Sequence, residues 1–341
     1  MFTSAKLTVR SPAKLILSGE HAVVYGYPAI AMAIDRYTQV TAKMIQQPLI
    51  KLKLFDFGYT CSHTFQALKS IQNRIQNNYN SFLKGQCSIK EVLTMPFELL
   101  QFSVTNLIDS LNLQIPSGLH LEVGSKIPIG CGMGSSAAAV VGTLHAVLKY
   151  VGVDIENNKF LSISRESESL QHGKSSGLDI YITKNGGTCH FQQGTITNIA
   201  NPLQEIYLVN TGAPTSSTGE CVTQVAEHFE KTNIGDDFAQ VTQHIQGAIQ
   251  LPGNEELIYS IKENHKLLTK IGVVPNNIGQ MIGSIESIGG AAKICGAGAV
   301  IGSNAGALLV VGEQGQLSDV VSKYGYKLET FDVDVLGTHV I

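Results

Sequence analysis

Hydrophobic and polar positions alternate along the first 64 residues in the short pattern that is typical of β-strands. This pattern predicts strands at residues 7–9, 15–17, 39–45, 50–55 and 59–64. From residue 65 the hydrophobic spacing changes to every third or fourth position, which predicts helices over 65–83 and 89–113, the second with Pro96 early in its length. The N-terminal part of the chain is therefore expected to form a β-sheet that is followed by helices.

The middle and C-terminal parts of the chain mix the two patterns. A strand is expected at 119–123, a glycine-rich loop at 124–134, and helices at 135–151 and 155–171. Beyond residue 187 the predicted strands are 188–192, 206–210, 291–295, 307–311 and one near 326–333, and the predicted helices are 219–231, 238–249, 255–271 and 276–287. Strands and helices are segregated more than in an alternating βαβ array, so the predicted fold class is α+β, with a domain boundary near residue 200.

The composition adds a hint about binding. Charged residues make up only 15% of the 341 positions and glycines number 34, against a usual share of ~25% charged residues and ~7% glycine. The 43% of hydrophobic residues excludes a disordered chain. A chain with few charges and many glycines often binds anions through backbone amides, although tight turns explain the same composition equally well.

Charge and cysteine content exclude several classes of protein. The net charge is −3 and lysines and arginines form no cluster, so no nucleic-acid partner is expected. Two uncharged stretches, 127–148 and 294–312, are interrupted by glycines, which favours loop-and-element segments over membrane spans. Six scattered cysteines without a CxxC pair predict reduced thiols in a cytoplasmic protein, and the start MFTSAKLTVR lacks the apolar segment of a signal peptide.

The strongest local motif is the glycine-rich segment GCGMGSSAAA at 130–139. Alternating glycines allow a tight turn in which backbone N–H groups approach a ligand, and Ser135 is predicted to cap the N-terminus of the following helix. The positive end of the helix dipole then favours a phosphate group, and a serine hydroxyl beside it can ligate Mg²⁺. A tight loop without any ligand is the alternative.

Two other phosphate-binding motifs fit this chain less well. A Walker A loop requires GK[ST], and at the GKS of 173–175 the required upstream glycine is Glu168. A Rossmann dinucleotide site would use the glycines at 130–134 with Asp154 as the ribose-binding acid. Against it, Lys126 and Pro128 separate the glycines from the preceding strand, so this interpretation ranks second.

Charged residues in apolar surroundings form two further candidate clusters. Lys14 lies within the apolar run of 12–17, and a buried ammonium needs an anionic partner. Glu20 and His21 follow where that run ends; a snorkelling lysine and a surface turn are the alternative.

Glu168 comes at the end of the predicted helix, and Asp179 follows after a small-residue turn. Two carboxylates in this arrangement could have different roles, one binding a metal and one accepting a proton. The alternative is that both are ordinary surface groups, because a lone acidic residue usually lies in solvent.

In their order along the chain these motifs resemble those of the GHMP kinase superfamily and, within it, the family of mevalonate kinases. The stretch SPAKLILSGEHAVVYGYPA at 11–29 is similar to the first motif, and its GEH triplet followed by VVYG favours mevalonate kinases, because phosphomevalonate kinases tend to have tyrosine in place of His21. The segment GMGSSAA at 132–138 resembles the phosphate loop, which is usually GLGSSAA.

Three further segments extend the resemblance to about residue 312. Glu168 and Asp179 have the spacing of the magnesium-binding glutamate and catalytic aspartate of the superfamily. The sequence PTSST at 214–218 resembles the loop that carries a threonine near the phosphates. The segment KICGAGAVIG at 293–302 is similar to the third motif, which usually reads GAGGGG.

The resemblance implies a two-domain fold and a reaction. Residues 1–200 would form an N-terminal domain like ribosomal protein S5 domain 2, and residues 201–341 a ferredoxin-like C-terminal domain whose last strand could return to the first domain. The implied activity is ATP- and Mg²⁺-dependent phosphorylation of mevalonate to 5-phosphomevalonate, in isoprenoid precursor synthesis. A homodimer is compatible with the resemblance.

The resemblance also implies a role for each site residue. Asp179 would be the catalytic base, and Lys14 would neutralise charge beside it. The nucleotide phosphates would be bound by Gly130, Gly132, Met133, Gly134, Ser135, Ser136 and Ala137. Mg²⁺ would be held by Ser136 and Glu168, and the substrate would be bound by His21, Glu20 and Thr218.

Three departures from the superfamily pattern bear on the acceptor. The usual HGNPSGVDN is HGKSSGLDI at 172–180, the third motif is altered, and Cys131 replaces a common alanine. Because 172–180 is expected near the acceptor, another small-molecule kinase of the superfamily, acting on phosphomevalonate or a sugar, stays open. A non-catalytic binding protein of the same fold is disfavoured by the retention of Lys14, Glu168 and Asp179.

Overall fold

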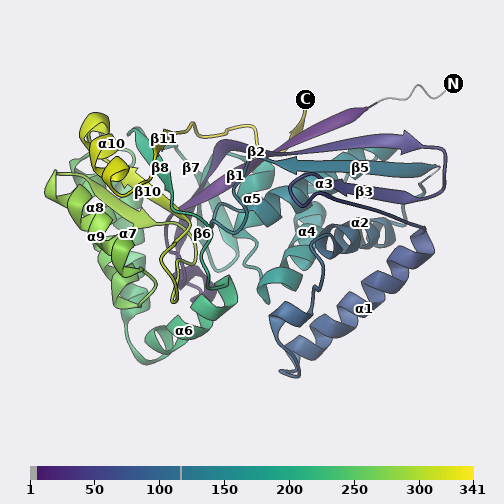
Figure 1. The fold of residues 1–341 in the computed structure, drawn as a ribbon, viewed down its shortest axis with the longest axis horizontal. Helices are drawn as coiled ribbons and strands as arrows, with labels where there is room; N and C mark the ends of the chain where they lie inside the picture. Colours follow the sequence, from purple (N-terminus) through teal and green to yellow (C-terminus); the bar gives the residue numbers. More distant parts are fainter. Residues whose placement is uncertain (1–5, 116) are drawn as a thin grey trace.

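The computed structural model describes residues 6–115 and 117–341, so the first five residues, on which the expectation about a signal peptide partly rests, lie outside the described part. These residues form two β-sheets with helices packed against each (Figure 1). One sheet has eight strands and the other has four, and strands and helices are segregated, which confirms the α+β class. In Figure 1 most of the purple-to-teal part of the chain forms one lobe and most of the green-to-yellow part the other, while the yellow C-terminal end returns to the first lobe.

The eight-stranded sheet has the order β12-β1-β2-β5-β3-β4, with β6 paired to β2 and β7 paired to β6. Its strands are β1 (Leu7–Ser18), β2 (Ala29–Ile45), β3 (Ile50–Leu54), β4 (Tyr59–His63), β5 (Gly118–Ser125), β6 (Thr188–Gln192), β7 (Thr195–Ile199) and β12 (His339–Val340). Among the described residues of this sheet only β3 and β5 pair in parallel, whereas a Rossmann fold needs a mostly parallel sheet. The structure thereby removes the dinucleotide-binding interpretation.

The long strand β1 joins two segments that were predicted separately, 7–9 and 15–17. Pro12 lies between them, and the pairing register with β2 shifts between Pro12 and Ala13. A proline cannot donate a ladder hydrogen bond, so an irregularity at this point lets the strand continue. The two segments therefore form a single strand, and Lys14 lies on it just after this irregularity.

Helices gather on one side of this sheet (Figure 1). They are α1 (Phe65–Leu83), α2 (Glu98–Leu111), α3 (Ser135–Val151), α4 (Asn157–His172) and α5 (Leu178–Asn185), with short 3₁₀ turns η1 (Ala22–Tyr25) and η2 (Ile89–Glu91). The predicted helix at 89–113 is divided, because Pro96 lacks an N–H group and restricts the residue before it, so that α2 begins only at Glu98.

The small residues of α3 let this helix lie directly on β1 and β2. A Cβ atom at Gly142 would lie 3.1 Å from a Val40 methyl group and 3.2 Å from Ser11 Cβ. Ala137 and Ala138, in the first turn, are fully buried. Close packing therefore fixes the N-terminus of α3 beside the strand that carries Lys14.

The four-stranded sheet has the order β11-β8-β10-β9 and is antiparallel throughout. Its strands are β8 (Ile206–Asn210), β9 (Ala291–Ile294), β10 (Ala307–Val311) and β11 (Leu328–Thr330). Its helices are α6 (Thr218–Lys231), α7 (Ile234–Ala248), α8 (Glu255–Lys270), α9 (Asn276–Ser287) and α10 (Gln314–Lys323). The prediction missed the helices α5 and α10, the strands β7 and β12 and the first part of β2, residues 29–38. The strand β12 returns to the first sheet, where it pairs with β1.

The two lobes share a hydrophobic core. Leu15, Leu17 and Met32 of the first sheet belong to the same buried cluster as Leu208 and Leu309 of the second sheet. Across the described ranges 6–115 and 117–341, none of the helices has the length and apolar character that a membrane span requires.

Candidate active site

Lys14 of β1 lies where three of the predicted motifs meet. Its side chain is buried, with 4% of the residue exposed, and its ammonium group lies 3.1 Å from the Oδ2 atom of Asp179 in the first turn of α5. Its backbone N–H donates to the Met133 carbonyl at 3.0 Å. The buried ammonium therefore has the anionic partner that its apolar surroundings require, and the same residue is attached to the glycine-rich loop.

The glycine-rich loop bends closely around the Lys14 side chain. Gly130, Gly132 and Gly134 all have left-handed backbone angles, with φ between 72° and 78°. A Cβ atom at Gly134 would lie 2.7 Å from Lys14 Cγ, so a side chain at this position would collide with the lysine. Glycine is needed here both for the backbone conformation and for the space.

Gly134, rather than Ser135, is the N-cap residue of α3, which corrects the predicted cap. The chain must turn sharply past Lys14 before the helix begins, and only a residue in the left-handed region makes that turn. Ser135 is the first helical residue, and no side-chain cap bond forms at this end. The helix N-terminus therefore keeps backbone N–H groups without intrahelical partners, which favours an anionic ligand.

The first glycine-rich loop packs directly on the third motif. A Cβ atom at Gly132 would lie 2.4 Å from the Cys295 carbonyl oxygen, and one at Gly296 would lie 3.0 Å from Gly132 Cα. The Ala307 N–H donates to the Cys131 carbonyl at 2.9 Å. Several glycines of these loops are thus explained by contact between two backbones, in addition to any role in binding phosphate.

Glu168, on the last turn but one of α4, is 3% exposed and accepts a hydrogen bond from the Ser175 hydroxyl through Oε2. Burial, and then the negative charge of Asp179, raise the pKa of Glu168 to about 8, while Ser175, Lys14 and Arg165 act in the opposite direction. The structure therefore brings Glu168, Asp179 and Lys14 into one group of interacting charges. The Ser136 hydroxyl lies nearby on α3, 3.4 Å from His172 Nε2 at the end of α4.

The donor set fits a magnesium ion that arrives with a nucleotide. Within the described residues no three side chains of histidine, cysteine, aspartate or glutamate converge on one point. Mg²⁺ commonly takes one or two protein oxygens and fills its other positions with phosphate oxygens and water. A buried carboxylate, Glu168, and a hydroxyl, Ser136, beside a loop that suits phosphates match this pattern.

His21 follows Glu20 beyond the end of β1, in a left-handed conformation with φ 61°. Its Nε2 atom is 3.0 Å from the Ala297 carbonyl oxygen of the third motif. Burial lowers the pKa of His21 to about 4, so the ring is neutral, donates from Nε2 and keeps Nδ1 as an acceptor. Nδ1 is buried and has no hydrogen-bond partner among the described residues, and it could accept from a bound hydroxyl group.

Glu20 makes a contact that the sequence prediction missed. Its Oε1 atom accepts a hydrogen bond from the Lys293 ammonium group, and both side chains are completely buried. Lys293 also donates to the Ile16 carbonyl at 3.1 Å. Glu20 therefore connects the end of β1 to β9, and its assignment as a substrate-binding residue stays a prediction. Lys293 lies within the apolar run AAKIC, and a lysine within an apolar run is the same feature by which Lys14 was identified as a candidate.

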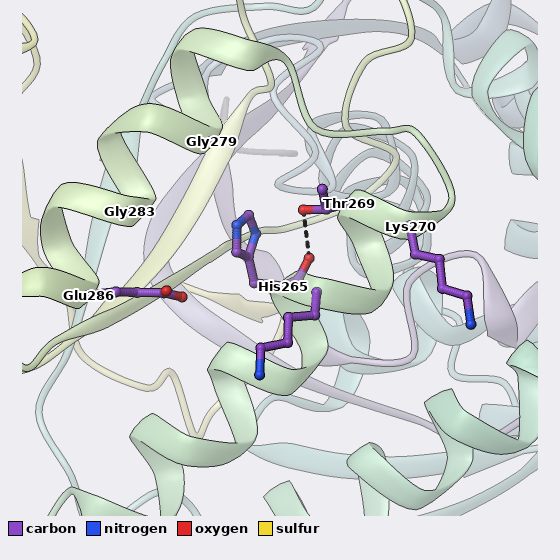
Figure 2. Close-up of a pocket in the computed structure, with 7 residues that line it drawn as sticks. His265, Thr269, Lys270, Gly279, Gly283 and Glu286 are labelled. Atoms are coloured by element: carbon purple, nitrogen blue, oxygen red, sulfur yellow. Dashed lines mark hydrogen bonds between the residues drawn. The ribbon is translucent and has the colours of Figure 1, made fainter.

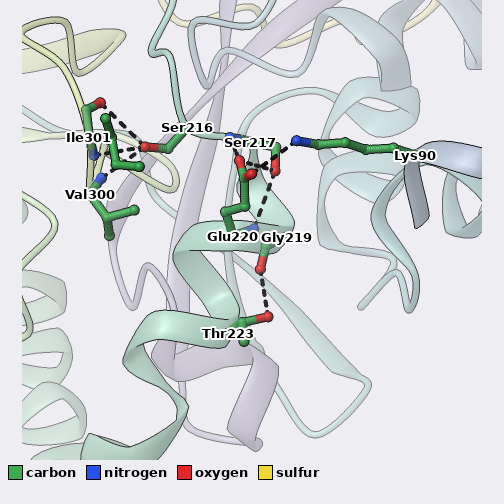
Figure 3. A network of polar contacts seen from close by, with 8 residues as sticks. All are labelled: Lys90, Ser216, Ser217, Gly219, Glu220, Thr223, Val300 and Ile301. Carbon is green, nitrogen blue, oxygen red and sulfur yellow. Dashed lines mark hydrogen bonds and ion pairs between the residues drawn. The ribbon is translucent and has the colours of Figure 1, made fainter. Parts of the chain in front are cut away.

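Thr218 is the exposed first residue of α6, beside a polar network that joins both lobes (Figure 3). The Ser216 hydroxyl accepts hydrogen bonds from the N–H groups of Val300 and Ile301 at 3.1 and 2.9 Å. Ser217 and Glu220 form a capping box at the start of α6, and Glu220 also accepts a hydrogen bond from Lys90 at 2.9 Å. The network fixes the loop at 213–218 against the third motif, and in the described structure Thr218 itself makes no side-chain hydrogen bond.

A separate cavity of about 540 Å³ lies between α8 and α9 (Figure 2). It is lined by His265, Lys266, Thr269, Lys270, Gly279, Gly283 and Glu286. None of these residues belongs to the cluster around Lys14 and Asp179. The cavity is therefore a feature of the second lobe and not a part of the candidate active site.

Comparisons with known proteins show which class of proteins this fold and cluster are similar to. A model of the GHMP kinases N terminal domain matches residues 99–187. Mevalonate kinase of Methanocaldococcus jannaschii is 28% identical over 298 residues, which cover 86% of this chain and 89% of that protein. Mevalonate kinase of Pyrococcus furiosus is 29% identical over 311 residues, which cover 86% of each. A crystal structure of mevalonate kinase superposes with a TM-score of 0.78 at 25% identity, covering 96% of this chain and 99% of that one.

Residues 99–187 match the GHMP kinase N-terminal domain, and most of the chain is similar to kinases of the GHMP superfamily, whose members use ATP as a substrate. Within this superfamily it is most like the mevalonate kinases. The fold alone does not decide the acceptor, because Lactococcus lactis galactokinase complexed with galactose superposes with a TM-score of 0.75 at 15% identity and covers 98% of this chain and 95% of that one.

Proposed function

We propose that the protein catalyses the ATP- and Mg²⁺-dependent phosphorylation of mevalonate to 5-phosphomevalonate. The observation that carries the proposal is the pairing of Lys14 with Asp179 at 3.1 Å, beside the glycine-rich loop and the N-terminus of α3. A base, a cation and a phosphate-binding helix terminus at one place are what phosphoryl transfer to an alcohol requires. Relatives that match most of the chain and bear the name mevalonate kinase support the choice of acceptor.

The glycine-rich loop is proposed to bind the nucleotide phosphates. Its left-handed glycines and the free N–H groups at the start of α3 suit phosphate oxygens without a basic side chain. The residues assigned to this role are Gly130, Gly132, Met133, Gly134, Ser135, Ser136 and Ala137. Met133 contributes through its backbone, since its carbonyl accepts from Lys14 and its side chain is buried.

Ser136 and Glu168 are proposed to hold Mg²⁺. The ion would supply charge neutralisation at the β- and γ-phosphates. The role of the protein is to keep one carboxylate and one hydroxyl oriented toward the position of those phosphates. The near-complete burial of Glu168 restricts where its carboxylate can point.

Asp179 is proposed to accept the proton of the primary hydroxyl of mevalonate. The hydroxyl oxygen forms a bond with the γ-phosphorus, the bond between that phosphorus and the β,γ-bridging oxygen breaks, and ADP leaves. The Asp179 side chain is 28% exposed, so one side of the carboxylate can reach a substrate while the other contacts Lys14. The Lys14 ammonium stabilises the charge that develops on the attacking oxygen.

His21 is proposed to bind the acceptor through its unpartnered Nδ1 atom, which requires a hydrogen-bond donor such as a hydroxyl. Thr218 is proposed to lie near the phosphates, because the third motif fixes its loop. Glu20 is proposed to act on the substrate only indirectly, by holding the backbone next to His21 through its pair with Lys293.

The experiment that tests the proposal is a panel of acceptors with purified protein, ATP and Mg²⁺, in which ADP formation is measured. We expect turnover with mevalonate and much less with phosphomevalonate or galactose. The departure HGKSSGLDI near the acceptor favours testing these alternatives first. Turnover with one of them but not with mevalonate would assign the protein to another branch of the superfamily.

The cellular setting is part of the same proposal. All six cysteines are free thiols in the structure, which suits a reducing compartment, and we place the protein in the cytoplasm. Sedimentation velocity tests the homodimer that the resemblance allows.

A further inference from the structure

Ser175 attaches the turn between α4 and α5 to α4 through several hydrogen bonds. The Ser175 N–H donates to the Ser169 hydroxyl at 3.3 Å, and its carbonyl accepts from Arg165 Nε at 2.8 Å. Its hydroxyl donates to Glu168 Oε2. All three polar groups of Ser175 thus bind residues in the last two turns of α4.

The same hydroxyl reaches forward to α5. The Gly177 N–H donates to Ser175 Oγ at 3.1 Å, and Gly177 is the left-handed N-cap residue of α5, two positions before Asp179. Ser175 is 6% exposed and Glu168 is 3% exposed, so water does not easily replace these bonds. The hydroxyl therefore links the carboxylate assigned to the metal with the start of the helix that carries the base.

A hydrogen bond at Oε2 decides which carboxylate oxygen is left for a metal. The terminal torsion of a glutamate side chain is broad, so its two oxygens exchange unless a partner fixes one of them. Ser175 holds Oε2, and in the described part of the chain no hydrogen bond reaches Oε1. Partners of this kind orient metal-binding side chains, and their removal commonly weakens metal binding about 10- to 100-fold.

We propose that Ser175 is a positioning residue of the Mg²⁺ site, whose hydroxyl holds the Glu168 carboxylate with Oε1 directed to the metal and couples it to the helix start that carries Asp179. This inference rests on the proposed function, because it takes Glu168 as the metal ligand. The usual superfamily sequence HGNPSGVDN has proline at this position, which offers neither an N–H group nor a hydroxyl. The present chain therefore anchors the turn through the hydrogen bonds of Ser175, which a proline could not make.

The test is the binding of Mn²⁺ to the protein in complex with ADP, measured by the loss of the free Mn²⁺ electron paramagnetic resonance signal. We expect Ser175→Ala to weaken Mn²⁺ binding by about 10-fold or more. In steady-state assays it should raise the Mg²⁺ requirement by a similar factor, with recovery of kcat at high Mg²⁺ and little change in KM for mevalonate. Ser175→Thr, which keeps a hydroxyl, should bind Mn²⁺ within about threefold of the wild type.

Ser169→Ala is the matched control. The Ser169 hydroxyl accepts from the same turn but does not contact Glu168, so its removal should leave Mn²⁺ binding unchanged. Equal weakening by Ser169→Ala and Ser175→Ala would mean that the turn is merely loosened, and the inference would be wrong. Unchanged Mn²⁺ binding in Ser175→Ala would also overturn it. If Ser175→Ala does not fold, Ser175→Cys keeps the shape with a weaker donor and should give a smaller loss in the same direction.

Glu168→Gln separates this inference from the proposed function. If Glu168→Gln binds Mn²⁺ as the wild type does, Glu168 is not a ligand and the metal assignment itself fails. If Glu168→Gln weakens binding while Ser175→Ala does not, the metal assignment stands and only the role of Ser175 fails.

Discussion

At the scale of single residues, the site depends on a lysine that the surrounding strand buries and a carboxylate that stays accessible. The Lys14 side chain is 5% exposed and the Asp179 side chain is 28% exposed. A buried ammonium beside a half-buried carboxylate holds one face of the acid and leaves the other face free to accept a proton. This asymmetry distinguishes the pair from a surface ion pair, in which both groups would be solvated.

Replacing Asp179 by asparagine tests the assignment of the base. Asp179→Asn keeps the size of the side chain but removes its ability to accept a proton. We expect kcat to fall about 10²- to 10⁴-fold, as it does when a general base is lost. ATP binding, measured by calorimetry, should stay close to that of the wild type, because the nucleotide-binding loop is unchanged. A variant that keeps near-native turnover would show that another group takes the proton.

The pH dependence of activity tests the environment of His21. Burial lowers the pKa of His21 to about 4 from an ordinary value of 6.5, because desolvation disfavours the charged ring. His21 is therefore neutral on both sides of pH 6.5, and its protonation should not contribute to the acid limb of the kcat/KM profile there. We expect His21→Gln to raise KM for mevalonate while the midpoint of that limb stays unchanged. Loss of an ionisation near 6.5 in the variant would contradict the burial of this ring.

At the scale of elements, local patterns predicted best the helices and strands whose apolar pattern is uninterrupted. The helices α1 and α3 begin and end at the predicted residues, because each has an uninterrupted apolar periodicity. Strand β1 was predicted as two pieces, since Pro12 and Lys14 break the apolar pattern inside a strand that is almost completely buried. Its hydrogen bonds to β2 decide its length, and that pairing is not visible in either segment alone.

The contact between the two glycine-rich loops predicts a loss of stability on mutation that can be separated from backbone strain by a control variant. Gly132 and Gly152 have similar left-handed φ angles, 78° and 71°, but a Cβ atom at Gly132 would lie 2.4 Å from the Cys295 carbonyl oxygen, whereas one at Gly152 would meet nothing within 4 Å. We expect Gly152→Ala to lower the free energy of unfolding by about 1–2 kcal/mol through backbone strain. Gly132→Ala should lower it by about 1–3 kcal/mol more, because the loops must also separate.

Urea denaturation measures both free energies, and the KM for ATP gives a second comparison. Gly132→Ala should raise this KM, since the displaced loop is the one assigned to the phosphates, and Gly152→Ala, at the far end of α3, should not. Equal effects of the two substitutions on stability and on KM would show that the glycine loop tolerates a side chain, and that its packing on the third motif is not required.

At the scale of the whole molecule, the two lobes are joined by a common core and by one buried ion pair. Glu20 follows β1 of the first sheet, and Lys293 lies on β9 of the second, with no exposure of either side chain. Burial raises the pKa of Glu20, and Lys293 opposes that rise. A pair without access to water has strong mutual attraction but also a large desolvation penalty, so each member depends on the other.

Removing one member of this pair should lower the free energy of unfolding more than removing both. Lys293→Met leaves the Glu20 carboxylate buried without a cation, and we expect the free energy of unfolding to fall by about 3–5 kcal/mol. In Glu20→Leu/Lys293→Met no buried charge remains, and most of that loss should be recovered. Urea denaturation of the single and double variants measures the difference. A double variant as unstable as Lys293→Met would mean that the lysine acts through its packing and not through its charge.

The sequence was informative about the site wherever its chemistry is local. The glycine-rich loop, Lys14 in an apolar run, and the spacing of Glu168 and Asp179 are each visible in a short segment. The pairing of Glu20 with Lys293 joins residues 273 positions apart, and it could be found only after the two lobes were placed together. The Ser175 hydroxyl bond to Glu168 was hidden for another reason, since a serine after a helix is most often a turn residue exposed to solvent.

The central claim is that this molecule transfers the γ-phosphoryl group of ATP to mevalonate. The most direct measurement is ³¹P and ¹H nuclear magnetic resonance of the products formed from mevalonate, ATP and Mg²⁺ by the purified protein. We predict one phosphomonoester on the C5 oxygen of mevalonate for each ADP formed, and loss of this product in Asp179→Asn. ADP formation without a phosphorylated mevalonate, or no reaction with mevalonate while phosphomevalonate or a sugar is consumed, would contradict the account.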